Sequence, residues 1–214
     1  NRNDTNDHAL CSQIQGSGNI LSSAEAYYPS QFTNGSDPES AWGSVKTFNS
    51  DGFTLQDGPS GYNKVNLSAK TYVGWAWDAG SSAATASTDG SITPSAQWIN
   101  ATAGFSITKW NGTEAAATVG HGLGAPPEFI MVKSLEEALS WAVYHKDAGN
   151  THALALDTNA ARQDADSFWN DTTPTNTVFS VKNASRTNGP SKDMIAYAWT
   201  PIECYSAFGG YTGN

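Results

Sequence analysis

The chain has 214 residues, enough to bury a sizeable core in one large or two small domains, and only 14% of them are charged. The net charge is -9, with 11 Lys and Arg against 20 Asp and Glu, which argues against a nucleic-acid-binding surface. No apolar run approaches the roughly 20 residues of a membrane-spanning helix, so we expect no membrane insertion.

Short alternating segments predict β-strands in the first half of the chain. In residues 51–55 and 72–77, aromatic and β-branched side chains alternate with small or polar ones. Asn-Gly and Asp-Gly pairs, which accept the positive φ angles of tight turns, begin at Asn34, Asp51, Asp89, Asn111 and Asn188. Residues 81–90 are small, polar and unpatterned, which indicates a linker.

The second half of the chain continues this pattern. Further strands are predicted at residues 105–109, 128–133, 141–145, 153–156 and 177–181. Helical signals are confined to residues 134–139 and 159–165, and each is too short for a major helix. Many short strands divided by turns predict an all-β protein, an antiparallel β-sandwich of jelly-roll or lectin-like type.

Two stretches of the chain resemble each other. They open with His8-Ala9-Leu10 and His152-Ala153-Leu154, and they close with Tyr72-Val73-Gly74-Trp75-Ala76-Trp77 and Met194-Ile195-Ala196-Tyr197-Ala198-Trp199. A repeated unit is more often a building block than a catalyst. We expect two residue pairs to occupy matching places in two superposable units: Phe53 with Phe179, and Trp77 with Trp199.

The repeat predicts a tandem organisation. Residues 1–80 form a first β unit that lacks its opening strands, and residues 91–202 form a second. Residues 203–214 begin a further repeat, because Tyr205–Asn214 resembles Gly104–Thr113 and each follows one copy. The chain is therefore interpreted as a section of a longer array.

Residues with catalytic or metal-binding chemistry form no recognisable motif. Gly-x-Ser-x-Gly, His-x-x-x-His and Cys-x-x-Cys are absent, and so is a calcium loop of alternating acids. His121, in Gly120-His121-Gly122-Leu123-Gly124, is expected to hydrogen-bond a loop carbonyl rather than to act as a base. We expect no catalytic residue, no metal ligand and no cofactor.

Eight tryptophans offer another route to function, because aromatic rings stack on sugar faces. Trp77 and Trp199 occupy equivalent repeat positions and are expected to be framework residues. Trp98, Trp110 and Trp169 lie near predicted loops and are the carbohydrate-binding candidates.

Two cysteines, Cys11 and Cys204, do not make a disulfide framework. Cys11 aligns with Ala155 in the repeat, so the fold does not require a thiol there. Free, buried thiols are favoured, and a disulfide between the two stays an alternative.

Several segments together resemble a known kind of protein. They are Thr88–Thr93, Thr102–Ile107, Gly120–Lys133, Ser140–His145, Trp169–Thr175, Val178–Val181 and Tyr205–Asn214. Over about residues 45–214 they closely resemble tandem modules in tail-fibre-like structural proteins of tailed bacteriophages, notably marine and cyanobacterial phages.

The resemblance implies a non-enzymatic protein of the virion, in a tail fibre or surface appendage that contributes to host-surface attachment. It implies a homo-oligomer, commonly a trimer, together with other virion proteins and a host surface glycan as partners. It brings no catalytic residues. The alternative is a lectin-like carbohydrate-binding module of a viral or secreted protein, and a third hypothesis is an enzyme that cuts surface polysaccharide with two carboxylates.

Overall fold

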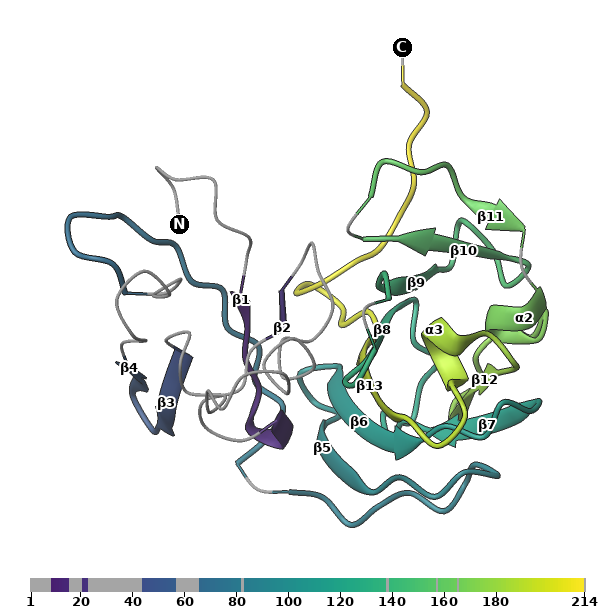
Figure 1. Ribbon diagram of the computed structural model, residues 1–214, viewed down its shortest axis with the longest axis horizontal. Coiled ribbons are helices and arrows are strands. Elements are labelled where there is room, and N and C mark those ends of the chain that lie inside the picture. Colours follow the sequence, from purple (N-terminus) through teal and green to yellow (C-terminus); the bar gives the residue numbers. More distant parts are fainter. Residues whose placement is uncertain are drawn as a thin grey trace. The chain divides into compact units, whose positions relative to one another are not determined.

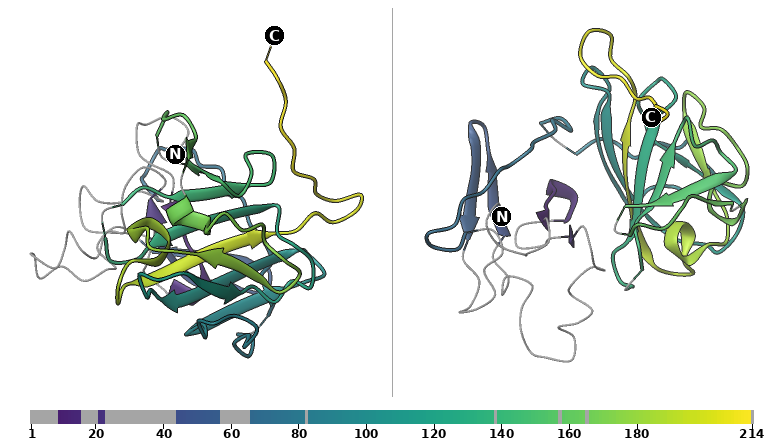
Figure 2. Two further views of the ribbon diagram at one scale, coloured as in Figure 1. Left: turned by 90° about the vertical axis from the view of Figure 1, so that its right-hand side faces the viewer. Right: turned by 90° about the horizontal axis from the view of Figure 1, so that it is seen from above.

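The computed structural model describes residues 9–15, 21–22, 44–56, 66–81, 83–137, 139–156, 158–164 and 166–213. The chain divides into two compact units. Unit 1 comprises Asn1–Ala76 and Glu136–Ala138, and unit 2 comprises Trp77–Leu135 and Leu139–Asn214. Strands dominate and pair in antiparallel ladders, which confirms the predicted all-β class and is consistent with a β-sandwich (Figures 1 and 2).

The described residues of unit 1 contain two small antiparallel pairs. Strand β1 (Ala9–Leu10) pairs with β2 (Leu21–Ser22), and a 3₁₀ turn, η1 (Gln13–Gln15), lies between them in the sequence. Strands β3 (Ser44–Asn49) and β4 (Gly52–Gln56) form a hairpin around the predicted Asp51-Gly52 turn. Phe48 and Phe53 lie opposite each other in this hairpin.

Unit 2 is built on a seven-stranded sheet. Its strands are β5 (Ala96–Asn100), β6 (Phe105–Asn111), β8 (Phe129–Ser134), β9 (Ala142–His145), β10 (His152–Ala155), β11 (Gln163–Asp164) and β13 (Asp193–Trp199). They lie in the order β11-β10-β9-β8-β13-β6-β5. β13 is therefore an interior strand that pairs with β6 on one side and with β8 on the other.

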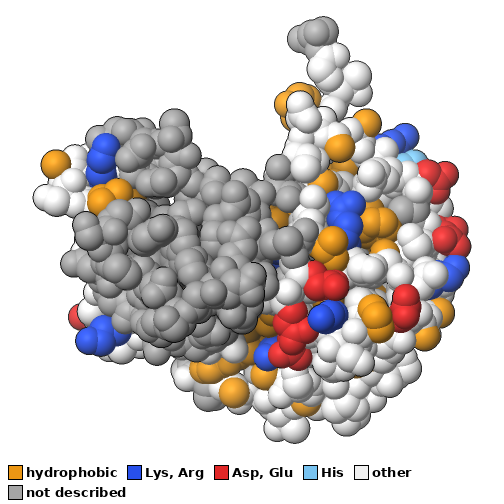
Figure 3. Space-filling view, viewed as in Figure 1, with side chains coloured by type: hydrophobic (Ala, Val, Ile, Leu, Met, Phe, Trp, Pro, Cys, Tyr) orange, Lys and Arg blue, Asp and Glu red, His pale blue; other side chains and the backbone are white. Residues whose placement is uncertain are grey.

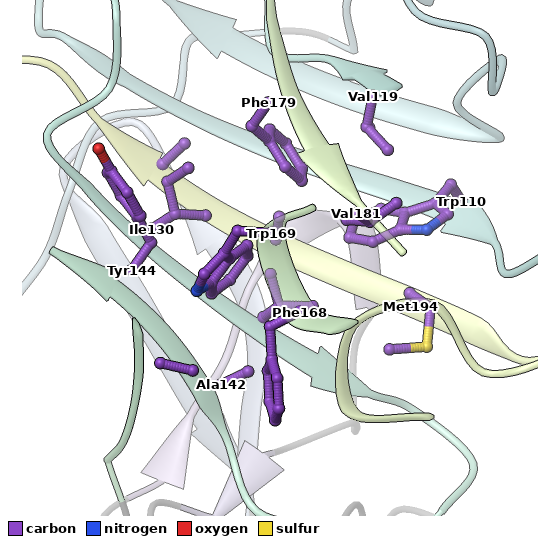
Figure 4. Packing of buried hydrophobic residues seen from close by; sticks show 14 of the residues in the cluster. Trp110, Val119, Ile130, Ala142, Tyr144, Phe168, Trp169, Phe179, Val181 and Met194 are labelled. Atoms are coloured by element: carbon purple, nitrogen blue, oxygen red, sulfur yellow. The ribbon is translucent and has the colours of Figure 1, made fainter. Parts of the chain in front are cut away.

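A second layer faces this sheet. It contains the antiparallel pair β7 (Ala117–Gly120) and β12 (Val178–Val181), and Ile92 joins β7 through a parallel bridge to Val119. Trp110, Ile130 and Met194 from the sheet share one core cluster with residues of β7 and β12 (Figure 4). The short helices α2 (Asp166–Trp169) and α3 (Ser185–Asn188) complete the unit, and α2 contributes two aromatic side chains to that cluster.

Strand β13 is buried on both faces. Met194 and Ala196 point into the core cluster, so side-chain alternation places Ile195 and Tyr197 on the opposite face. All four side chains are at most 2% exposed. This explains why the sequence of β13 is almost continuously apolar instead of alternating with polar residues.

Several sequence predictions of local structure are wrong. Residues 72–77 are extended but lie in no strand, although their composition favours one. Neither predicted helix forms among the described residues: Ser134 ends β8, and Gln163–Asp164 forms β11. A strand requires a hydrogen-bonded neighbour as well as suitable residues, which local patterns do not reveal.

The segment predicted as a linker is held to unit 2. The Ala84 N–H donates to the Gln97 carbonyl oxygen at 2.8 Å, and the Ser87 N–H donates to Gln97 Oε1 at 2.8 Å. Gln97 is fully buried, and its Nε2 also donates to the Gly120 carbonyl oxygen and to Thr108 Oγ1. One buried amide thus joins the segment to β6 and β7, so residues 83–90 belong to the body of unit 2.

The prediction that two residue pairs occupy matching places in two superposable units is wrong. Phe53 is 51% exposed on the β3–β4 hairpin, whereas Phe179 is 1% exposed in the core of unit 2. Trp77 and Trp199 do not occupy separate units, because their rings contact each other edge to face at 5.9 Å between centroids.

Candidate functional site

Two of the three carbohydrate-binding candidates are core residues. Trp110 is 0% exposed and packs edge to face on Phe179, with 5.8 Å between the ring centroids. Trp169, at the end of α2, is 2% exposed and packs in the same way on Tyr144 at 5.9 Å. Both rings are buried in the core, and burial there contradicts the predicted surface position of Trp110 and Trp169.

Trp98 is the remaining candidate. It lies half-buried on β5, opposite Ile107 of β6. Trp98 therefore occupies the sheet face opposite to the core cluster, because its strand neighbour Gln97 points toward β7. The structure brings no second tryptophan candidate to this face.

Both ring nitrogens of His121 form hydrogen bonds with the backbone in the glycine-rich turn. The Leu123 N–H donates to His121 Nδ1 at 3.2 Å, so the ring proton is on Nε2, which donates to the Thr175 carbonyl oxygen at 3.1 Å. Gly122 and Gly124 adopt φ angles of 70° and 74°, which glycine tolerates best. The expectation that His121 bonds a loop carbonyl is confirmed.

Burial of His121 should make the free energy of unfolding depend on pH. His121 is fully buried, and burial lowers its pKa, against weaker opposing effects of the Thr175 carbonyl and of the negative charge on Asp89. The unfolded chain therefore takes up a proton first, near the ordinary histidine pKa of about 6.5. The contribution of neutral His121 to stability is therefore present above that pH. We expect the free energy of unfolding to fall as the pH drops below it.

Urea unfolding at a series of pH values between neutral and mildly acidic measures this effect. His121→Gln, which retains a donor for the Thr175 carbonyl, should lower the stability at neutral pH and flatten the pH dependence. An unchanged slope in His121→Gln would contradict the assignment.

Two further polar side chains bind the loops of unit 2 together. Asn188 is fully buried, and its Nδ2 donates to the carbonyl oxygens of Ala115 and Lys182 at 2.9 and 2.8 Å. The Arg186 guanidinium donates to the Ser140 and Trp141 carbonyl oxygens. These groups are used by the framework and are not available for chemistry.

An exposed aromatic group was missed by the sequence prediction. Trp75 and Trp77 are 66% and 51% exposed, although alternation predicted a strand there. Trp77 leads into a cluster that we call the aromatic corner: Trp77, Phe105, Phe129, Trp199 and Phe208. Phe105, Phe129 and Trp199 belong to β6, β8 and β13, and the rings meet at the end of β13 that Trp199 forms. Trp77 precedes the strands of the sheet in the sequence, and Phe208 follows them.

Acidic and sulfur ligands do not converge in the described part of the chain. No group of three or more His, Cys, Asp or Glu residues there could hold a metal ion. Asp166, which is two residues from Asp164 in the sequence, forms an ion pair with Lys182 at 2.6 Å. Cys11 and Cys204 are both free thiols, and Cys204 is exposed, which corrects the expectation that both are buried.

On the face of the molecule drawn in Figure 3, uncharged side chains cover most of the described area. In the view of Figure 3, acidic and basic side chains are scattered among uncharged and hydrophobic ones. In the described residues, no helix has the length and apolar character needed to cross a membrane.

Comparisons with known proteins give a family and nothing closer. No curated protein and no solved structure shows significant similarity to the chain. One family model, described as a domain of unknown function (DUF7483), matches residues 1–214. The chain therefore belongs to the DUF7483 family.

Proposed function

We propose that the chain is a non-enzymatic structural module of a phage virion, part of a tail fibre or surface appendage that contributes to host-surface attachment. The proposal starts from the resemblance of residues 45–214 to tail-fibre-like modules. It places the protein in the extracellular particle, as a homo-oligomer, with a trimer as the first expectation.

The observation that carries the proposal is that three polar side chains suited to catalysis or binding are buried and hydrogen-bonded to the backbone. His121, Gln97 and Asn188 are each fully buried, and their polar atoms bond backbone groups of other loops. An enzyme would direct some such groups toward a substrate. In unit 2 they instead fix the positions of loops, as a load-carrying module requires.

The low charge of the chain supports the same proposal. Only 14% of the residues are charged, and uncharged side chains cover most of the described area on the face seen in Figure 3. Such a surface limits unspecific electrostatic adhesion, which an exposed appendage must avoid. We also propose that unit 1 is an incomplete copy of the jelly-roll or lectin-like sandwich of unit 2, as in a tandem array.

A second candidate function is carbohydrate binding. It is favoured by the exposure of Trp75 and Trp77, whereas Trp110 and Trp169 are buried. A glycan-array screen with the purified chain, repeated with Trp75→Ala, tests this candidate. Binding that is lost in Trp75→Ala and retained in Trp98→Ala would favour it over the purely structural role.

Immunogold electron microscopy of particles from the native source tests the first proposal. Antibodies against the purified chain should label appendages that project from the particle. Peptides of the chain should also appear when washed particles are analysed by mass spectrometry. Absence of both label and peptides from intact particles would overturn the proposal.

A further inference from the structure

The residues that follow β13 turn back across one end of the seven-stranded sheet. Strand β13 ends at Trp199, and a tight turn follows, closed by an antiparallel bridge between Ile202 and Ser206. In this turn the N–H groups of Tyr205 and Ser206 both donate to the Ile202 carbonyl oxygen at 2.9 Å. Cys204 has a φ angle of 62°, in the left-handed region that tight turns use. The turn reverses the direction of the chain.

The first anchor of this segment is Ile202. A Cβ placed on Gly104 would lie 2.8 Å from Cγ1 of Ile202, so the isoleucine side chain packs on the glycine that precedes β6. The Thr200 N–H donates to the Gly104 carbonyl oxygen at 2.9 Å and holds the chain at the same place. The segment therefore begins beside the start of β6.

Two further anchors lie on the other side of β13. The Phe208 ring stacks on Phe129, the first residue of β8, with 5.9 Å between centroids and 13° between planes. The Gly210 N–H donates to the carboxylate of Asp147, two residues after the end of β9. Because the strand order is β9-β8-β13-β6, the three anchors follow one another across the sheet. We call residues 202–210 the strap.

The strap covers part of the aromatic corner. The rings of Phe105 and Phe129 both contact Trp199 at this end of the sheet, with 4.8 and 5.3 Å between centroids. Phe208 occupies one face of the Phe129 ring. A large exposed apolar patch favours unspecific association. A covering ring at this place keeps the end of the sheet from forming such a patch.

The strap is attached by far fewer interactions than a strand of the sheet. Beyond the bridge that closes the turn, residues 207–213 lie in no ladder, and Tyr211, directly after the strap, is 96% exposed. In Figures 1 and 2 this yellow segment extends from the body of unit 2. Ile195 of β13, by contrast, is fully buried and lies in ladders on both sides. Segments with few contacts open at a lower free energy than the core strands of the same domain.

We propose that the strap opens and closes over the aromatic corner as one unit while the seven-stranded sheet stays folded, and that the hydrogen bond from Gly210 to the Asp147 carboxylate holds it closed. A hydrogen bond to a charged acceptor is stronger than one to a neutral acceptor, so this single contact carries a large share of the attachment. Closing buries the Phe208 ring against Phe129, and opening exposes both rings. The inference goes beyond the proposed function and does not depend on a location in a virion.

Hydrogen exchange of single amides in the full chain, followed by NMR, tests the role of Asp147. The Gly210 amide should exchange more slowly than that of Gly213, which lies beyond the strap, and much faster than that of Ile195 in the sheet. Asp147→Ala should raise the Gly210 exchange rate roughly tenfold or more, while the Ile195 amide stays far slower. The matched control is Asp164→Ala, at an exposed carboxylate of β11, which should leave the Gly210 rate unchanged because the strap opens without β11.

Binding of the apolar dye ANS tests the covering role. Phe208→Ala removes the ring that stacks on Phe129 and should raise the dye fluorescence several-fold. Tyr211→Ala, at an exposed aromatic residue just beyond the strap, is the matched control and should leave dye binding unchanged. Phe208→Ala should also speed the exchange of the Gly210 amide, because the strap is released as one unit.

Four results would overturn the proposal. A Gly210 amide that exchanges as slowly as that of Ile195 would make the strap part of the folding unit of the sheet. One that exchanges as fast as that of Gly213 would mean that the strap is not closed. An unchanged Gly210 rate in Asp147→Ala would show that the carboxylate does not hold the strap. If Phe208→Ala bound no more dye than the unmodified chain, the strap would not cover the aromatic corner.

Discussion

Trp110→Ala should unfold or nearly unfold unit 2. The Trp110 ring is 0% exposed, packs on Phe179, and belongs to the cluster that joins the seven-stranded sheet to β7 and β12. Removing a buried tryptophan side chain costs about 3–5 kcal/mol, from lost transfer free energy and from the cavity left behind. Such a loss is a large part of the total stability of an ordinary domain, about 5–15 kcal/mol.

Urea unfolding followed by far-ultraviolet circular dichroism, in dilute solution, measures this loss. Trp110→Phe should cost much less than Trp110→Ala, because it keeps a ring against Phe179. It also removes an indole N–H that is buried without a hydrogen-bond partner among the described residues.

Trp75→Ala is the exposed control and should change the stability by less than about 0.5 kcal/mol. If Trp110→Ala kept full stability and abolished glycan binding, Trp110 would be a binding residue after all.

Trp98 and Trp110 lie on opposite faces of the seven-stranded sheet, and the sequence does not distinguish the two faces. Trp98 is the middle residue of β5 and Trp110 is the next-to-last residue of β6, and nearness to a predicted loop predicts exposure for both. In a strand, however, one step along the chain exchanges the buried and the opposite face. Trp110 faces Met194 across the β6–β13 ladder and shares its orientation toward the core. The sequence alone did not fix that register.

The predicted strands, by contrast, were largely recovered. The clean alternation of residues 105–109 and the apolar run 128–133 correspond to β6 and β8. In these segments, local preference and tertiary pairing agree.

Residues 72–77 show the opposite case. They carry the same kind of sequence as β13, yet they lie in no ladder. A β-strand needs a hydrogen-bonded neighbour that is distant in the sequence. A residue pattern therefore identifies a segment that is able to pair but does not show whether it pairs.

Gly112→Ala should strongly lower the free energy of unfolding, although it adds only one methyl group. A Cβ at this position would overlap the carbonyl oxygen of Gly189 and lie 2.9 Å from the carbonyl carbon of Asn188. The neighbours cannot retreat, because Gly112 N–H donates to the Lys192 carbonyl oxygen at 2.8 Å and Ser191 N–H donates to Gly112 O at 2.9 Å. Forcing extra volume into such a contact costs about 1–3 kcal/mol or more.

The loss for Gly112→Ala should exceed the usual overpacking cost, because the obstructing atoms are backbone and are also tied to Asn188. The Asn188 amide joins that loop to Thr113 and Ala115, so displacing it strains several buried hydrogen bonds at once. The matched control is Gly213→Ala, at the repeat position equivalent to Gly112, where a Cβ meets nothing within 4 Å. Thermal and urea unfolding should show a large loss for the first variant and almost none for the second. Equal stability of the two variants would mean that the loop at Asn188 moves to make room for the added Cβ. The hydrogen bonds of the buried Asn188 amide would then not fix the position of that loop.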